Sequence, residues 1–75
     1  MFQPSAHATD RYIERFAGNL SSGAARRQLQ RIARRARFRR PLPGGARLYA
    51  TGSVNLVVQD RVIVTVYRLT TLPVD

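Results

Sequence analysis

Apolar side chains recur at helical spacing in the first half of the chain and alternate with polar ones in the second half. Ile13 and Phe16 lie three residues apart, the spacing of one face of a helix. Ser5 can accept hydrogen bonds from the free backbone amides at the start of such a helix. Gly18 tolerates the left-handed backbone with which many helices end. The pattern predicts a first helix over residues 5–18.

A second and longer helix is predicted over residues 22–40. Its apolar seam recurs at intervals of four, three and four residues: Ala25, Leu29, Ile32 and Ala36. Around the seam lie eight arginines: Arg26, Arg27, Arg31, Arg34, Arg35, Arg37, Arg39 and Arg40. Like charges one turn apart destabilise a helix by about 0.2–0.5 kcal/mol per pair, so the crowding is easier to understand if a polyanion relieves it. Two prolines and two glycines in residues 41–45 end the helix.

Three strands are predicted within residues 46–69, because valine and other strand-forming residues alternate there with polar ones. Gln59, Asp60 and Arg61 are expected to form a three-residue hairpin loop between the last two strands. That loop places six apolar side chains on the face toward the helices: Val54, Leu56, Val58, Val62, Val64 and Val66. The opposite face then carries Asn55, Val57, Ile63, Thr65 and Tyr67.

These elements predict an α+β fold in which two N-terminal helices pack on a three-stranded antiparallel sheet. Tyr12 and Phe38 are expected in the core, Phe2 outside it, and residues 70–75 in a loose tail. A chain of 75 residues has room for a single domain. Such a small domain buries only about 60% of the surface of its unfolded chain.

The charge of the chain indicates what kind of partner the protein binds. All thirteen basic residues are arginine, and the net charge is +9. Guanidinium groups bind phosphate through paired hydrogen bonds and stack on bases. The sequence therefore predicts a nucleic-acid partner, with RNA favoured. A basic surface that is merely solvated, and an acidic protein partner, remain open alternatives.

Several classes of chemistry lack the residues that they need. The chain has no cysteine and one histidine, which excludes disulfides and argues against structural zinc. The acidic residues are too few and scattered for a two-metal nuclease: Asp10, Glu14, Asp60 and Asp75. A phosphate-binding loop with Lys and Ser or Thr is also missing. No metal and no cofactor are expected.

No membrane association is expected either. The first eight residues lack the basic start and apolar stretch of a secretory signal, and no apolar run approaches the roughly 20 residues that span a bilayer. The apolar seam of the second helix is rich in alanine and is needed by the core, which argues against binding to a membrane surface. We expect a soluble, cytoplasmic protein.

The chemistry that remains is acid–base cleavage of RNA without a metal, in which the 2′-hydroxyl of the substrate attacks the adjacent phosphate. His7 could accept or donate a proton near neutral pH, and Arg11 and Arg15 could hold the phosphate. Thr65 could bind a phosphate oxygen, and Tyr67 could donate a proton or stack on a base. Three of these residues have a simpler alternative. His7 is then an exposed or capping residue, and Thr65 and Tyr67 are ordinary strand residues.

The opening of the chain resembles a known motif. Residues 7–15 read His-Ala-Thr-Asp-Arg-Tyr-Ile-Glu-Arg, which is similar to the HAxxRxxER opening of a family of small bacterial and phage domains of unknown function. That family also ends in a hairpin with an Asp-containing turn and a strand like residues 62–67. It is usually placed with the barnase–EndoU–colicin–RelE-like (BECR) ribonuclease fold. One departure is that the family's turn commonly has Asp-Gly where this chain has Asp60-Arg61, which leaves the turn type open.

The resemblance implies two N-terminal helices against an antiparallel sheet and metal-independent RNA cleavage, often by a toxin that an antitoxin holds. It assigns the site to five positions: His7, Arg11, Arg15, Thr65 and Tyr67. Two functions therefore stay open, and with them whether the protein is an enzyme. One is a small endoribonuclease. The other is a non-catalytic module that docks on nucleic acid or on a nucleic-acid enzyme such as RNA polymerase. The oligomeric state also stays open.

Overall fold

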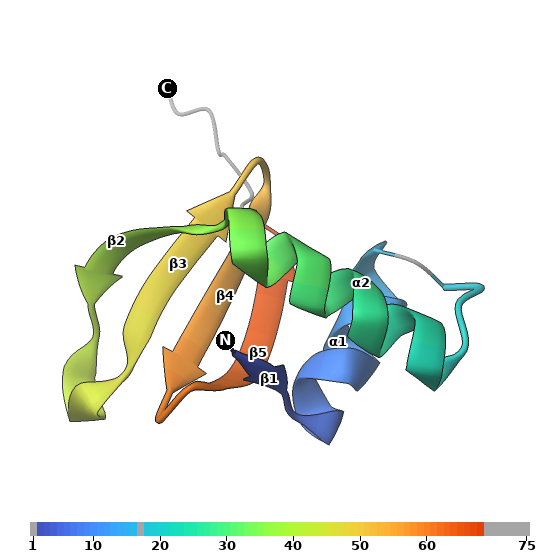
Figure 1. Ribbon diagram of the computed structural model, residues 1–75, viewed down its shortest axis with the longest axis horizontal. Coiled ribbons are helices and arrows are strands. Elements are labelled where there is room, and N and C mark those ends of the chain that lie inside the picture. The colour runs from blue at the N-terminus through green and yellow to red at the C-terminus, as the bar shows by residue number, and fades with distance from the viewer. Residues whose placement is uncertain (1, 17, 69–75) are drawn as a thin grey trace.

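The computed structural model describes residues 2–16 and 18–68. They form two helices, five strands and a short 3-10 turn (Figure 1), in this order: β1 (Gln3–Pro4), α1 (Ala6–Phe16), α2 (Ser22–Arg35), β2 (Arg37–Pro41), the 3-10 turn (Pro43–Gly45), β3 (Arg47–Thr51), β4 (Val54–Gln59) and β5 (Val62–Arg68). The strands make one sheet in the order β1-β5-β4-β3-β2. β1 pairs parallel to β5, and the other pairs are antiparallel. The α+β class is confirmed, but the sheet has five strands and is mixed, whereas three antiparallel strands were predicted.

Ser5 fixes the start of α1, as its sequence position predicts. Its Oγ accepts a hydrogen bond from the backbone amide of Ala8 at 3.0 Å, which satisfies one of the free amides of the first turn. Its own backbone amide donates to the carbonyl oxygen of Ile63 at 3.0 Å. One residue therefore caps the helix and joins it to β5. Gly18 lies in a turn after the helix, and Ala17 is outside the described residues.

The end of the second helix differs from the prediction. α2 ends at Arg35, and the chain continues in extended conformation through Ala36, whose ψ is 144°. The apolar seam stops there, since its next positions are Arg39 and Arg40. The residue before a proline is also restricted to extended backbone, and Pro41 imposes that restriction on Arg40. Three of the eight arginines assigned to the helix therefore lie on β2: Arg37, Arg39 and Arg40.

The hairpin between β4 and β5 has a two-residue turn, whereas a three-residue loop was predicted. Asp60 and Arg61 both have positive φ, 53° and 65°, the geometry of a type I′ turn, whose twist matches that of the flanking strands. The pairing runs from Gln59 with Val62 to Val58 with Ile63, and then shifts at a bulge.

The predicted faces of β5 are correct on one side of the bulge and wrong on the other. Beyond it, Leu56 pairs with Val66 and Val57 with Thr65. The register differs from the predicted one, which paired Leu56 with Val64, but these side chains lie on the predicted faces. Before it, Ile63 is fully buried in the core, although it was predicted on the opposite face. A shift of one residue reverses the face of every side chain in a strand.

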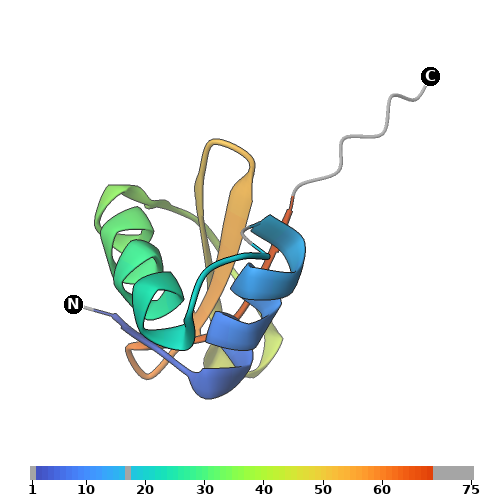
Figure 2. The same ribbon diagram turned by 90° about the vertical axis from the view of Figure 1, so that its right-hand side faces the viewer.

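The core lies between the helices and one face of the sheet. α2 crosses that face, and α1 runs along the β5 edge (Figures 1 and 2). The buried cluster takes residues from both helices and from β4 and β5: Ala8, Tyr12, Ala25, Leu29, Leu56, Val58, Ile63 and Val66. Burying each larger aliphatic side chain contributes about 1.5–3 kcal/mol, so the docking of α2 depends mainly on Leu29.

Two aromatic residues lie where the sequence did not place them. Phe2 packs against the core, and its ring meets that of Tyr49 edge to face at 4.9 Å between centroids. Phe38 was expected in the core, but it is 50% exposed on β2. Its ring also meets Tyr49 edge to face, at 5.7 Å. The N-terminal segment therefore belongs to the packed structure, and the β2 edge presents an aromatic side chain beside its arginines.

Candidate nucleic-acid interface

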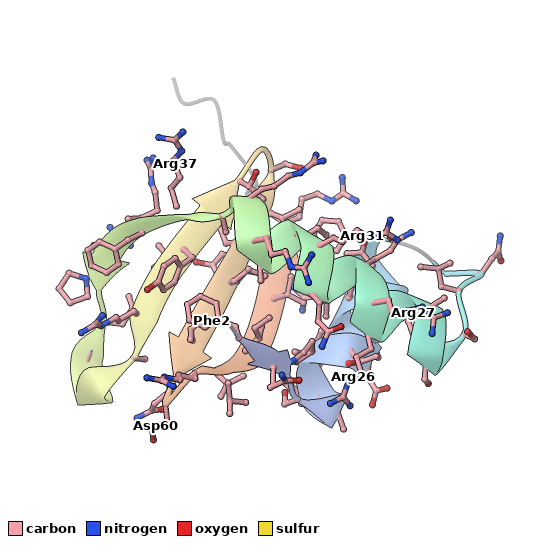
Figure 3. All side chains as sticks on the ribbon, viewed as in Figure 1. Phe2, Arg26, Arg27, Arg31, Arg37 and Asp60 are labelled. Carbon is pink, nitrogen blue, oxygen red and sulfur yellow. The ribbon has the colours of Figure 1, made fainter. Side chains whose placement is uncertain are left out.

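The outer face of α2 carries five exposed arginines: Arg26, Arg27, Arg31, Arg34 and Arg35. Ala25 and Leu29 are fully buried on the inner face, so the positions between them point outward at the helical period. Figure 3 shows three of these arginine side chains extending away from α2. The same packing that docks the helix therefore presents its charges to solvent.

The positive charge continues from α2 onto β2, the edge strand of the sheet. Only Ala36 separates the end of α2 from the start of β2, and Arg37, Arg39 and Arg40 are all exposed. Figure 3 shows Arg37 projecting from the start of β2. We call the five arginines of α2 and the three of β2 the arginine surface.

The charges of the arginine surface are not neutralised within the described structure. Among residues 2–16 and 18–68, the one ion pair joins Arg11 Nη1 to Glu14 Oε1 at 2.9 Å. Apart from Arg11, every arginine is exposed. An uncompensated field of one sign attracts polyanions and speeds their association. The surface therefore has the electrostatic character that nucleic-acid contact requires.

A second feature lies on the face of the sheet that α2 does not cover. Residues paired side by side in a sheet point to the same face. Tyr49 packs toward the core, so the neighbouring row must point the other way. That row consists of Arg37, Ala50, Asn55 and Tyr67.

This uncovered face contains a cavity of about 430 Å³, which we call the sheet cavity. Its lining comes from the last four strands and the turn between β3 and β4: Arg39, Arg40, Leu48, Ala50, Thr51, Gly52, Asn55 and Tyr67. The volume falls within the range of pockets that hold small ligands. The lining contains two guanidinium groups and no carboxylate, so the sheet cavity favours an anion.

Asn55 is the unusual residue of the sheet cavity. Its side chain is 5% exposed on the central strand β4. Its Nδ2 is buried and has no hydrogen-bond partner among the described residues. Leaving such a group unpaired costs about 1–3 kcal/mol, and most buried polar groups in native proteins are paired. The unpaired Asn55 donor is therefore an exception within the described sheet that the packing of its neighbours does not explain.

The five residues predicted as a catalytic site fall on two neighbouring elements. α1 and β5 run side by side, since Ser5 Oγ contacts the carbonyl oxygen of Val64 at 3.4 Å and Arg68 Nη2 donates to that of Arg15 at 2.9 Å. Thr65 and Tyr67 lie on the uncovered face of β5.

The side chains of that predicted site are not all gathered in one cavity. Tyr67 lines the sheet cavity with Arg39, Arg40 and Asn55, whereas neither His7 nor Arg11 is among its lining residues. His7 and Arg15 are exposed on α1, and Arg11 is engaged by Glu14. The structure thus groups Tyr67 with arginines of β2, which the sequence had assigned to a helix. The catalytic roles stay a prediction.

One feature of the sequence marks Asn55 as unusual. Asn55 stands between Val54 and Leu56 in a strand otherwise rich in valine, and asparagine is disfavoured in strands. Its burial and its missing partner depend on neighbours that are distant in sequence. Only the structure shows them.

Within residues 2–16 and 18–68, no group of three or more His, Cys, Asp or Glu side chains is placed to hold a metal ion. No helix in the same part of the chain is long and apolar enough to cross a membrane. Comparison with protein-family models, curated proteins and solved structures gave no match. The resemblance in residues 7–15 therefore stays a prediction as well.

Proposed function

We propose that the protein binds single-stranded RNA through the arginine surface. The observation that carries the proposal is the set of eight exposed arginines on α2 and β2, none of which has a carboxylate partner among the described residues. Arginine binds phosphate with paired hydrogen bonds. An array of exposed guanidinium groups on a packed helix and strand therefore suits a flexible chain of phosphates.

Two accessible aromatic side chains favour a single strand over a duplex. Sequence-tolerant binding of single strands combines a positive surface with aromatic side chains on which bases stack. Phe38 is half exposed beside the arginines of β2, and Tyr67 lines the sheet cavity. Bases can reach such side chains only when they are not paired within a helix.

The test is a comparison of nucleic acids of equal charge. The anisotropy of a fluorescein-labelled 12-nucleotide oligouridylate, at low salt, reports binding directly. We expect it to bind at least about fivefold more tightly than a duplex DNA with the same number of phosphates, because stacking contributes about 1–3 kcal/mol per base. Equal affinities would reduce the proposal to unspecific charge attraction. Absence of RNA binding would contradict it.

A ribonuclease is the second candidate, and one observation favours it. α1 lies along β5, so His7 and Arg11 belong to the element next to the strand that carries Thr65 and Tyr67. Such an arrangement could supply a proton acceptor, a phosphate ligand and a proton donor to the 2′-hydroxyl reaction.

Cleavage is tested by incubating RNA with the protein in a metal chelator. The ribonuclease proposal expects cleavage that falls by about 100-fold or more in His7→Ala. Gln3→Ala, which changes another exposed residue near the N-terminus, serves as the control. Intact RNA excludes the catalytic function, and cleavage that both variants retain excludes the role of His7 in it. Either result leaves the binding function standing.

A further inference from the structure

The sheet cavity has two properties that a purely electrostatic surface does not need. It encloses a volume of about 430 Å³, and it keeps the Asn55 Nδ2 donor buried and unpaired within the described structure. Phosphate attraction by exposed arginines requires neither. The cavity therefore points to a ligand with a hydrogen-bond acceptor that can enter the sheet surface.

The lining residues define the chemistry of that ligand. Arg39 and Arg40 provide positive charge at one side, from the edge strand β2. Tyr67 provides an aromatic side chain at the other side, from β5, and Asn55 lies between them on β4. A matching ligand has an anionic group, a flat body and a polar edge. A nucleotide has all three, because its phosphate binds guanidinium, its base stacks on an aromatic ring, and its base edge carries acceptors.

We propose that the sheet cavity is a binding site for one nucleotide of an RNA strand, and this proposal rests on the proposed RNA-binding function. Arg39 and Arg40 hold the phosphate, Tyr67 stacks on the base, and Asn55 Nδ2 donates to an acceptor on the base edge. The arginines of α2 lie on the other side of the sheet and hold a neighbouring part of the strand, which passes around the β2 edge to reach this site. The cavity thus gives the protein a preference among RNA sequences, which charge attraction does not supply.

The site changes slightly when the nucleotide enters. Asn55 Nδ2 has almost no contact with solvent in the free protein, so a neighbouring side chain must move before an acceptor can reach it. Arg39 and Arg40 are long, exposed side chains on an edge strand, and exposed side chains change rotamer within nanoseconds. Movement of an arginine to meet the phosphate opens the amide in the same step.

The first experiment is a nuclear magnetic resonance titration of the 15N-labelled chain with uridine 5′-monophosphate. The side-chain NH2 signals of Asn55 report directly on the donor. We expect them to shift on binding, with uridine alone and inorganic phosphate alone each binding at least about fivefold more weakly. Unchanged Asn55 signals at saturating nucleotide would overturn the proposal. So would equal binding of inorganic phosphate, which would define a simple anion site.

The second experiment uses Asn55→Leu, which removes the donor and keeps the branched shape of the side chain. We expect at least about fivefold weaker nucleotide binding. Asn19→Leu is the matched control, since Asn19 is an exposed residue in the turn after α1, and it should bind nucleotide as the wild type does. If Asn55→Leu does not fold, Arg39→Gln replaces it, with Arg47→Gln on β3 as its control, since Arg47 is exposed and lies outside the arginine surface and the sheet cavity. Equal effects of variant and control would overturn the proposal.

Loss of the cavity site and loss of RNA binding give different results. RNA binding that is steeply salt-dependent, together with no nucleotide effect on Asn55, overturns the cavity proposal and leaves RNA binding intact. Failure to bind RNA at low salt overturns the proposed function itself. Shifts of Asn55 with a glutamate-rich peptide and not with the nucleotide would assign the cavity to an acidic protein partner.

Discussion

The arginine surface and the sheet cavity hold their polar groups in opposite ways. The arginines of α2 stand in solvent, where they need no partner and are free to move. Asn55 is 5% exposed and unpaired within the described structure. Charge in solvent attracts any polyanion over a distance, whereas a buried donor acts only on a ligand of the right shape. The comparison assigns affinity to the first region and selectivity to the second.

The largest expected effect comes from a substitution that weakens the packing of α2 on the sheet. Leu29 is fully buried in the core, and its replacement by alanine should lower the free energy of unfolding by about 2–5 kcal/mol. Chemical denaturation measures this change. Arg31→Ala on the exposed face is the control and should stay within about 0.5 kcal/mol of the wild type. Similar effects of both substitutions would mean that α2 does not pack as described.

Removing charge from α2 tests whether the arginine surface determines the affinity for RNA. For single strands each phosphate contact contributes a slope of about −0.7 in log K against log salt. Replacing Arg27, Arg31 and Arg35 by glutamine should therefore weaken RNA binding about 100-fold at 0.1 M salt and reduce the slope by about 2. The control is the same number of substitutions elsewhere, at Arg47 and Arg61 and at Arg15 on α1. Equal losses would show that charge acts without regard to position.

The free energy of unfolding of Asn55→Leu tests whether the sheet cavity keeps an unfavourable group for selective binding. An unpaired buried amide is unfavourable, and leucine suits a buried strand position beside Leu48 better. We expect the free energy of unfolding to rise by about 1–3 kcal/mol while nucleotide binding falls. A stabilising substitution that removes function is typical of a site that retains an unfavourable group for its activity. Loss of stability in this variant would mean that the amide has a structural partner after all.

A smaller effect concerns Tyr12, which joins α1 to α2 by donating its hydroxyl proton to Gln28 Oε1 at 2.6 Å. Burial raises the pKa of Tyr12 above 10.0, because the phenolate is poorly solvated there. The unfolded chain ionises first as pH rises through about 10. The stabilisation is therefore fully present below pH 10 and is lost as pH rises through the folded pKa.

Tyr12→Phe isolates this effect. Near pH 8 it should be less stable than the wild type by about 0.5–1.5 kcal/mol, the contribution of one hydrogen bond. The difference should shrink above pH 10, where only the wild type loses stability through this group. Unfolding curves between pH 8 and 11 measure it. A difference that stays constant across that range would contradict the raised pKa.

The elements that the sequence predicted well are those whose signals are local. Ser5 caps α1 because its hydroxyl meets an amide three residues away. The seam through Ala25 and Leu29 repeats at the helical period, and both residues are buried. Such patterns depend on near neighbours alone, and the sequence contains them completely.

The elements that the sequence missed depend on distant partners. β2 exists because Arg37–Pro41 pairs with β3, and the apolar seam gave the helix no later residue to bury. Ile63 is in the core because the turn has two residues and a bulge shifts the strand after it. A two-residue parallel strand at the N-terminus pairs with β5, far along the chain, and nothing local in Gln3–Pro4 signals it.

The candidate site divides in the same way. The abundance of arginine, and its concentration between residues 26 and 40, were visible in the sequence. The sheet cavity was not, because it combines residues of four strands. His7 and Arg11, which the motif singled out, lie outside the lining of that cavity, and Tyr67 lies within it. Bulk charge can thus be predicted without a fold, whereas a cavity requires the register of the strands.

RNA binding by the arginine surface is tested most directly by the salt dependence of binding to a single-stranded oligouridylate, measured by anisotropy from 0.05 to 0.4 M salt. Eight exposed arginines contacting phosphate would give a slope of about −6 in log K against log salt, and contact by half of them about −3. We predict a slope between these values. A slope shallower than about −1, or no binding at the lowest salt, would contradict RNA binding through the arginine surface.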